Sequence, residues 1–323
     1  MKRLMFWEVV VLAALLIAAF VVLVTFPSPK LPAEISGDPT ATTATQPTQS
    51  LFIPTWNTYP DDRPLTAQQY FVYDCKANTF LTGSGDASTQ VYPASITKLF
   101  TAYVAMQYLE PTAQVTATDA LDFVVPGSSV AKLETGDVLS VELLVEAMML
   151  PSGNDAAYVL ACEAGRAIEN NPQLGAAAAK DAFVAEMNAQ AAAAGMTGTH
   201  FVNPDGIHDS NHYSTFGDLA ILGKLALSNE TIMKYAATAK DKVTLHGETV
   251  EWKNTNKLID RTNSYFCPYA LGLKTGQTPD AGSCLLSAFR KDDYELIIGV
   301  FGCPLEEDRF DDTLQLFNQI VLK

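Results

Sequence analysis

The amino-acid sequence predicts an α+β fold: an antiparallel sheet made from both ends of a domain, a helical subdomain inserted between them, and one N-terminal transmembrane helix ahead of the domain. Strand-like patterns occur near both ends of the region 65–323, whereas helix-like periodicity fills its middle. A continuous apolar run stands near the amino terminus, followed by a stretch rich in proline and threonine. We therefore divide the chain into residues 1–26, 27–64 and 65–323.

The composition indicates a folded and acidic protein. The chain has 323 residues, 48% of them hydrophobic and 18% charged, so it is long enough to bury a substantial core. Its 36 acidic and 21 basic side chains give a formal charge of −15. Because such a charge repels phosphate backbones, we expect no nucleic acid as a partner.

The first apolar run, residues 9–26, is a candidate membrane segment. It contains no charged residue and, as a helix, has a length of about 27 Å, which is enough to cross the hydrocarbon core. Lys2 and Arg3 precede the run and the next basic residue is Lys30, so the remainder of the chain is expected outside the cytoplasm. A cleaved signal peptide, which would leave the domain secreted, is the alternative. The run ends in Val24-Thr25-Phe26-Pro27, which lacks a small-x-small cleavage pattern and favours an anchor.

Residues 27–64 predict an extended tether. They are rich in proline and threonine and contain few aliphatic side chains, so they cannot supply a packed core. The working part is therefore expected at 65–323, which holds all five cysteines. These show neither a C-x-x-C pair nor the Cys/His spacing of a structural zinc site, and their pairing cannot be derived from the sequence.

Within residues 65–323, the pattern of apolar residues predicts both strands and helices. The strands are expected at Gln69–Cys75, Thr79–Gly83, Ala270–Lys274, Ser283–Phe289 and Leu296–Phe301. The helices are expected at Ile96–Leu109, Val141–Leu150, Asp155–Gly165, Lys180–Gly195, Thr215–Leu227 and Phe310–Leu322. Thr215 and Asp218 form a capping box at the start of the fifth helix.

The first candidate site is the sequence Ser95-Ile96-Thr97-Lys98, at the predicted start of a long helix. Residues three apart lie on one helix face, so Ser95 and Lys98 are expected to be neighbours. A serine hydroxyl becomes a nucleophile when a base removes its proton, and a lysine amine can be that base when burial lowers its pKa. The motif alone is weak, because about one S-x-x-K is expected by chance in a chain of this length. The alternative is that Ser95 caps the helix and Lys98 is solvated.

Two further motifs strengthen the hypothesis of a nucleophilic serine. Ser152-Gly153-Asn154 lies in the connection between two apolar helices, where a hydroxyl and a carboxamide are expected to face a cleft. A simple helix cap at Asp155 is the alternative there. Lys274-Thr275-Gly276 ends a predicted strand, and its glycine allows close backbone approach at the strand edge. The three motifs, in this order and in these contexts, form a strong combined signal.

The combination resembles the serine D-Ala-D-Ala carboxypeptidases, the low-molecular-mass penicillin-binding proteins of peptidase family S11. The resemblance covers essentially all of residues 65–323 and implies a fold like that of the β-lactamases and DD-peptidases. The segments that carry it, in order, are Tyr92-Pro93-Ala94-Ser95, Gly127-Ser128-Ser129, Leu150-Pro151-Ser152-Gly153-Asn154-Asp155-Ala156-Ala157, Met187-Asn188, Asn203-Pro204-Asp205-Gly206, Tyr213-Ser214-Thr215 and Gly272-Leu273-Lys274-Thr275-Gly276.

The resemblance implies catalytic roles for four residues. Ser95 would attack the carbonyl of the penultimate D-alanine and form an acyl-enzyme, with Lys98 as its base. Ser152 would relay a proton to the leaving amine. Asn154 would hold Lys98 and the substrate amide.

The resemblance also implies substrate-binding roles for four residues of one strand. Lys274 and Thr275 would bind the substrate's terminal carboxylate. The backbone N–H of Gln277, with that of Ser95, would form the oxyanion hole, and the strand edge around Gly276 would pair with the peptide backbone. Gln277 stands where some relatives have histidine or tyrosine, which leaves the substrate preference open. The resemblance implies no metal and no organic cofactor.

The implied partners are peptidoglycan stem peptides ending in D-Ala-D-Ala, outside the membrane, and β-lactam antibiotics as inhibitors. Whether such an enzyme also acts as an endopeptidase cannot be read from the sequence. A non-catalytic sensor of cell-wall peptides or β-lactams would keep the same residues. A class A β-lactamase is disfavoured, because no glutamate stands four residues before any asparagine. A metal site at His208-Asp209-Ser210-Asn211-His212 is disfavoured because the segment is loop-like and has no third ligand.

Overall fold

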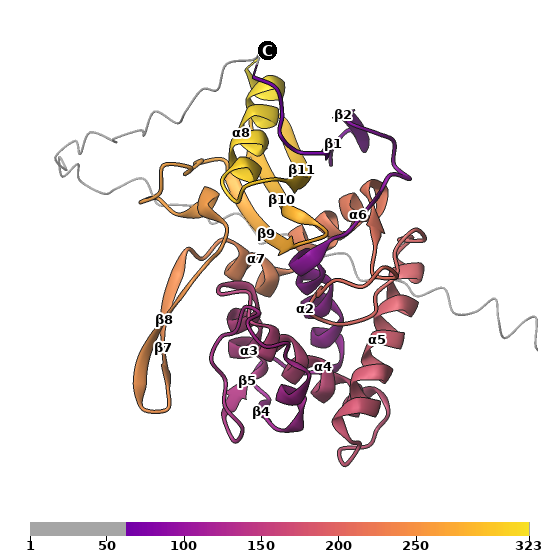
Figure 1. The fold of residues 1–323 in the computed structure, drawn as a ribbon, viewed down its shortest axis with the longest axis vertical. Coiled ribbons are helices and arrows are strands. Elements are labelled where there is room, and N and C mark those ends of the chain that lie inside the picture. The colour runs from indigo at the N-terminus through magenta and orange to yellow at the C-terminus, as the bar shows by residue number, and fades with distance from the viewer. Residues whose placement is uncertain (1–62, 323) are drawn as a thin grey trace, which may run out of the picture. The chain divides into compact units, whose positions relative to one another are not determined.

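The computed structural model describes residues 63–322, which form an antiparallel sheet and a block of helices (Figure 1). The predicted apolar run 9–26 and nearly all of the predicted tether lie outside the described residues. Within 63–322, no helix combines the length and the apolar composition that a membrane span requires.

The five-stranded sheet is built from both ends of the described region, in the order β2-β1-β11-β10-β9. Its strands are β1 (Gln69–Asp74), β2 (Thr79–Gly83), β9 (Ala270–Thr278), β10 (Gly282–Lys291) and β11 (Tyr294–Cys303). β1 runs antiparallel to β11, with Gln69 opposite Phe301. The predicted hairpin and the three later strands are confirmed. Strand β9 extends beyond its predicted end because Gly276 to Thr278 continue the pairing with β10.

The helical block lies between the two groups of strands in the chain. Its helices, with the one that closes the described region, are η1 (Ala94–Ile96), α2 (Thr97–Tyr108), α3 (Val141–Met149), α4 (Asn154–Ile168), α5 (Ala176–Ala193), α6 (Phe216–Leu227) and α8 (Asp308–Val321). All six predicted helices are confirmed with small shifts at their ends. The predicted cap of α6 is also confirmed, since the Thr215 hydroxyl accepts a hydrogen bond from the backbone N–H of Asp218.

Several short elements were not predicted from the sequence. They are β3 (Gln90–Val91), β4 (Gln114–Thr116), η2 (Asp119–Phe123), β5 (Val138–Ser140), β6 (Ser214–Thr215), α7 (Glu230–Ala236), β7 (Lys240–Leu245), β8 (Glu248–Lys253) and η3 (Lys257–Ile259). The hairpin β7–β8 projects from the body in Figure 1. Most of its side chains are exposed and many are charged, so it lacks the alternation of apolar residues that marks a strand.

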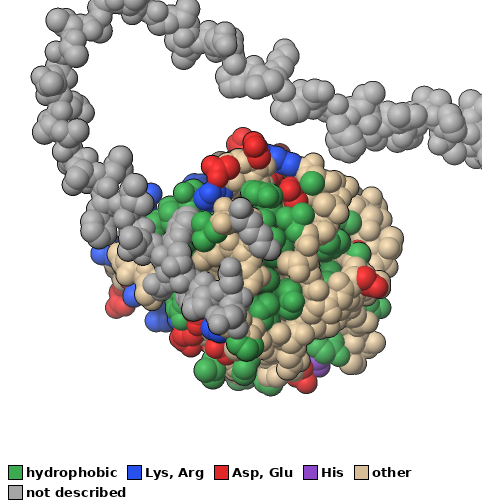
Figure 2. Space-filling model, turned by 90° about the horizontal axis from the view of Figure 1, so that it is seen from above, with side chains coloured by type: hydrophobic (Ala, Val, Ile, Leu, Met, Phe, Trp, Pro, Cys, Tyr) green, Lys and Arg blue, Asp and Glu red, His purple; other side chains and the backbone are tan. Residues whose placement is uncertain are grey.

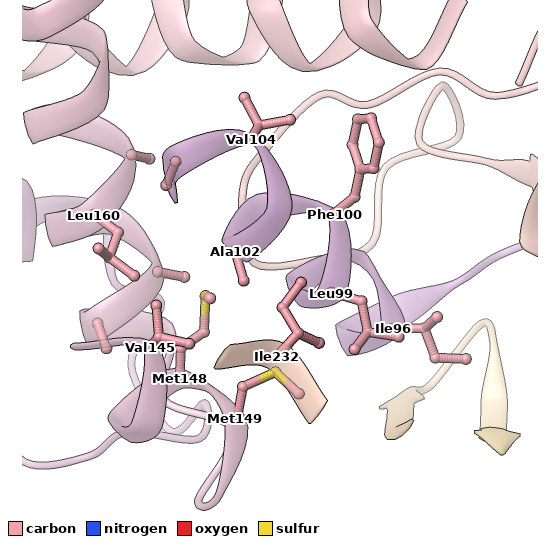
Figure 3. Packing of buried hydrophobic residues seen from close by; sticks show 14 of the residues in the cluster. Ile96, Leu99, Phe100, Ala102, Val104, Val145, Met148, Met149, Leu160 and Ile232 are labelled. Carbon is pink, nitrogen blue, oxygen red and sulfur yellow. The ribbon is translucent and has the colours of Figure 1, made fainter. Parts of the chain in front are cut away.

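Helix α2 lies at the centre of the main core (Figure 3). Its fully buried Leu99 and Phe100 share this core with Val145 of α3, Leu160 of α4 and Ile232 of α7. α2 follows directly from η1, which carries Ser95, and this places the first motif at the junction of the helices and the sheet.

A second apolar cluster covers the other face of the sheet. Helix α8 supplies Phe317, whose ring stacks on Phe289 of β10 with centroids 4.4 Å apart. Successive residues of β10 point to opposite faces, so Leu285 joins the α8 cluster and Leu286 joins the main core. The sheet is therefore covered on both faces.

One face of the molecule has few charged side chains at its centre. On the face shown in Figure 2, charged side chains of both signs lie mainly at the margin, and the uncovered centre is apolar or neutral.

All five cysteines fall within the described residues, and none of them forms a disulfide. Four are buried, and burial raises the pKa of the Cys284 thiol to about 11.

We predict that Gly165→Ala destabilises the domain. A Cβ at this position of α4 would lie 1.9 Å from the carbonyl oxygen of Ala179 in α5, so the two helices must separate. Overpacking of this kind costs about 1–3 kcal/mol of unfolding free energy, measurable by urea denaturation. Gly175→Ala is the matched control, because its Cβ would meet no atom within 4 Å. Equal losses in both variants would contradict the steric argument.

Candidate active site

Ser95 and Lys98 are in direct contact. Lys98 is fully buried, and its Nζ donates hydrogen bonds to Ser95 Oγ at 2.8 Å and to the carbonyl oxygen of Asp205 at 2.6 Å. Ser95 lies within the turn η1, and no side chain caps either η1 or α2. The predicted neighbourhood of the two side chains is confirmed, and the alternative of a capping serine with a solvated lysine is wrong.

The surroundings of Lys98 favour its neutral form. Burial lowers the pKa of the Lys98 amine to about 8, because the charged ammonium loses its hydration, while Asp205 and Asp155 oppose the shift. The carboxyl of Asp205 is itself buried, which raises its pKa, while Lys98 and the Tyr158 hydroxyl oppose the shift. With this pKa about one tenth of Lys98 is an unprotonated amine at pH 7, far more than for a lysine in water, and it contacts a hydroxyl.

Two glycines from distant segments hold the turn that carries Ser95. Gly206 has φ = +85°, and a Cβ there would lie 2.0 Å from the carbonyl oxygen of Ala94. A Cβ on Gly276 of β9 would lie 2.8 Å from the carbonyl oxygen of Pro93 and 3.2 Å from Ser95 N. The turn therefore fits between the 203–206 loop and β9 only because both positions lack a side chain. The close approach expected at Gly276 is confirmed.

The second motif lies between α3 and α4. Ser152 is buried and has φ = +62°, a left-handed conformation that is uncommon outside glycine. The backbone N–H of Asn154 donates to the carbonyl oxygen of Ser129 at 2.8 Å, and Asn154 Oδ1 is buried with no hydrogen-bond partner among the described residues. Lys98 is bonded to Ser95 and the Asp205 carbonyl rather than to Asn154. The Asn154 carboxamide oxygen thus has unused hydrogen-bonding capacity.

Asp155 does not cap α4, whose N-cap is Gly153. Its carboxylate instead accepts hydrogen bonds from the backbone N–H groups of Ala131 at 2.9 Å and Leu133 at 3.0 Å. Asp155 is thus more than a simple cap, because its carboxylate binds a separate loop as well as the backbone N–H of Ala156 in the first turn of α4, at 2.9 Å. Asp155 fixes the loop that carries Ser129 beside the second motif.

The third motif lies on β9, an edge strand of the described sheet. Lys274 is fully buried, and its Nζ donates to the carbonyl oxygen of Thr275 at 3.2 Å and to Thr255 Oγ1 at 3.4 Å. The hydroxyls of Thr255 and Thr275 share a short hydrogen bond. Burial, with the positive charges of Lys98 and Arg309, holds the pKa of Lys274 well below its usual value.

The motifs meet in a cleft of about 220 Å³. The residues that line it are Ser95, Ser129, Ser152, Thr255, Thr275, Gly276, Gln277, Glu306 and Arg309. The predicted residues Lys98, Asn154 and Lys274 lie buried behind this lining. A larger hollow of about 590 Å³ beside α6 contains none of the predicted residues. The structure thus brings all three motifs to one place.

Sequence reasoning missed several residues of the cleft. Arg309 donates from Nη1 to the carbonyl oxygen of Gly276 at 3.3 Å and from Nη2 to Glu306 Oε1 at 2.8 Å. Thr255 follows the unpredicted strand β8. These residues belong to no motif, and only the tertiary fold brings them to the cleft. Asp205 lies in a segment that had been noted for its resemblance, but no role was assigned to it.

The two histidines of the 208–212 segment face different partners. The buried His212 places Nε2 2.8 Å from Thr97 Oγ1, and its Nδ1 accepts from the backbone N–H of Val202 at 3.2 Å. His208 packs against the ring of Tyr92 and lies 3.7 Å from Asp280. Within residues 63–322, no three or more potential metal ligands gather.

The chain is similar to known carboxypeptidases in sequence. A family model described as D-alanyl-D-alanine carboxypeptidase matches residues 57–304. The D-alanyl-D-alanine carboxypeptidase of Streptomyces sp. (strain K15) is 35% identical over 242 residues, which cover 72% of this chain and 79% of that protein. The D-alanyl-D-alanine carboxypeptidase DacF of Bacillus subtilis (strain 168) is 30% identical over 229 residues, 69% of this chain. The match spans 54% of DacF, about half of its length.

Solved structures show the same likeness. The crystal structure of the Streptomyces K15 DD-transpeptidase is 31% identical, with a TM-score of 0.70, and the match covers 79% of this chain and 97% of that chain. A D-alanyl-D-alanine carboxypeptidase from Mycobacterium tuberculosis H37Rv is 26% identical, with a TM-score of 0.67, 82% of this chain and 93% of that chain covered. These likenesses confirm the predicted DD-peptidase-like fold. The chain belongs to the D-alanyl-D-alanine carboxypeptidase family, peptidase family S11.

Proposed function

We propose that this protein is a serine D-Ala-D-Ala carboxypeptidase that removes the terminal D-alanine from peptidoglycan stem pentapeptides. The observation that carries the proposal is the 2.8 Å hydrogen bond between the buried Lys98 amine and Ser95 Oγ at the end of the cleft. A hydroxyl paired with an amine of lowered pKa is what nucleophilic catalysis by serine requires. Family membership supports the same assignment.

In the acylation step, Ser95 Oγ attacks the carbonyl carbon of the penultimate D-alanine and Lys98 accepts the hydroxyl proton. The negative charge that develops on the carbonyl oxygen is stabilised by the backbone N–H groups of Ser95 and Gln277. Ser152 then donates its hydroxyl proton to the nitrogen of the departing D-alanine and takes up the proton that Lys98 had accepted, which leaves an ester on Ser95 and a neutral Lys98. Asn154 accepts a hydrogen bond from the substrate amide, using the Oδ1 that lacks a partner. Water subsequently hydrolyses the ester.

The terminal carboxylate of the substrate binds where positive charge gathers. Lys274 and Arg309 are buried beside the cleft, and the Thr275 hydroxyl provides a hydrogen-bond donor. An incoming carboxylate favours the protonated form of Lys274 and so opposes the lowering of its pKa. Local positive charge is needed because the protein as a whole carries a charge of −15. The edge of β9 around Gly276 pairs with the peptide backbone.

The same chemistry accounts for inhibition by β-lactams, which acylate Ser95 and leave a slowly hydrolysed ester.

We also propose that residues 9–26 anchor the protein in the cell membrane by a single span and that 27–64 tether the catalytic domain outside the cell. The apolar, uncharged character of the first segment supports the anchor.

We predict that Ser95→Ala abolishes D-alanine release from a diacyl-L-Lys-D-Ala-D-Ala peptide by the full chain in detergent, because the Ser95 hydroxyl is hydrogen-bonded to the Lys98 amine. Labelling by a fluorescent penicillin should be lost as well. The thermal unfolding midpoint should stay within about 2 °C of the wild type, since only one oxygen atom is removed. Undiminished release by the folded variant would refute the assignment.

The pH dependence of kcat/KM should show an acid limb centred near pH 8. Lys98 accepts a proton only when its amine is neutral, and its pKa is about 8. Activity should therefore rise with pH through this value and fall about tenfold per unit below it. Steady-state D-alanine release between pH 5.5 and 9.5 provides the measurement. A flat profile from pH 6 to 9 would argue against Lys98 as the base.

We predict that the full chain sediments with membranes and is released by detergent but not by high salt or carbonate, because an apolar span is held by the hydrocarbon core. Deletion of residues 1–26 should release the protein into the soluble fraction. If expression of the full chain instead yields a soluble protein that lacks its N-terminal residues, a cleaved signal peptide is indicated.

A further inference from the structure

Arg309 and Glu306 form an ion pair inside the cleft. The Arg309 side chain is 3% exposed, and its Nη2 donates to Glu306 Oε1 at 2.8 Å. Arg309 Nε is buried and has no hydrogen-bond partner among the described residues. The guanidinium lies in the first turn of α8, where the helix dipole disfavours a cation. A buried cation in this position needs a counter-charge, and Glu306 provides it.

Glu306 has a second cation within reach. Its side chain is 46% exposed, and its Oε1 lies 3.9 Å from Lys257 Nζ. Glu306 belongs to the turn between β11 and α8, and Lys257 begins η3. Lys257 Nζ also lies 3.2 Å from Glu307 Oε1. A side-chain rotation is therefore sufficient to transfer the Glu306 carboxylate from Arg309 to Lys257 without a change in the backbone.

A substrate carboxylate and Glu306 compete for the same guanidinium. Among the described residues that line the cleft, Glu306 is the only carboxylate. Two carboxylates within a few ångströms of each other in a half-buried site repel strongly, so Glu306 opposes an anionic ligand as long as it stays on Arg309.

We propose that Glu306 is a displaceable counter-ion that sets the affinity of the cleft for ligands with a free terminal carboxylate. On binding, the ligand's carboxylate takes the guanidinium of Arg309, and Glu306 moves to Lys257. Glu306 thus keeps Arg309 neutralised in the empty enzyme and weakens binding of every anionic ligand. The inference rests on the proposed function for the identity of the ligand, a peptide that ends in D-Ala-D-Ala.

The test is a binding measurement that needs no turnover. In the full chain carrying Ser95→Ala, calorimetry compares diacyl-L-Lys-D-Ala-D-Ala with the same peptide amidated at its carboxyl end. Added Glu306→Gln should tighten binding of the acid about threefold to tenfold, because the competing charge is gone. Binding of the amide should change by less than about twofold. The gain should therefore be confined to the ligand with a carboxylate.

Two further variants separate the counter-ion from general charge effects. Glu307→Gln removes the same charge from the next residue, which pairs with Lys257, and should alter acid binding by less than about twofold. Lys257→Gln removes the alternative partner of Glu306 and should weaken acid binding, but it should have little effect once Glu306→Gln is present. This non-additivity would identify Lys257 as the receiving cation.

The outcomes distinguish this inference from the proposed function. Equal changes for acid and amide, no gain with Glu306→Gln, or no detectable binding of the acid by any variant would overturn the inference. D-alanine release by the wild-type chain tests the function separately. Carboxylate-selective tightening by Glu306→Gln without any D-alanine release by the wild type would retain the counter-ion and refute the carboxypeptidase.

Discussion

The burial of the Lys98 amine is the constraint on which the rest of the site depends. A lysine exposed to water is protonated at neutral pH and cannot act as a base. Here the fully buried amine is hydrogen-bonded to Ser95 Oγ and to the Asp205 carbonyl, at the start of a helix in the centre of the core. Gly206 and Gly276 pack closely against the turn that carries Ser95. The packing that buries Lys98 in the core therefore also lowers the pKa of its amine.

Three buried basic side chains share this small region of an acidic protein. Lys98, Lys274 and Arg309 each lose hydration, and the positive charges of Lys98 and Arg309 further depress the pKa of Lys274. Such an arrangement costs folding free energy, and part of that cost is recovered when an anion enters. Glu306 recovers some of it in the absence of ligand. The cleft is thus electrostatically prepared for a carboxylate while the remaining surface repels one.

Local patterns predicted the elements and the motifs because the signal of each lies within a short stretch of sequence. Ser95 and Lys98 are one helical turn apart, and the β1–β2 hairpin is bounded by a short turn. The sequence did not predict Arg309, Glu306 and Thr255 as site residues, because their positions in the cleft depend on how distant segments pack. The hairpin β7–β8 was not predicted because its charged, exposed residues show no regular alternation of apolar and polar side chains. Left-handed φ values at Ala94, Ser152 and Leu273, each within or directly before a motif, also have no signal in ordinary residue types.

The pairing of β1 with β11 has a consequence for how the domain folds. Gln69 lies opposite Phe301, so the sheet cannot close until its last strand has emerged, and such long-range closure is slow compared with helix formation. The contacts of α2, α3 and α4 span shorter separations and can form earlier. β9 packs against the Ser95 turn and pairs with β10, so we expect the cleft to be completed late in folding, when the sheet closes. Partly folded chains with unpaired strand edges are therefore prone to aggregation, and they lack the assembled cleft.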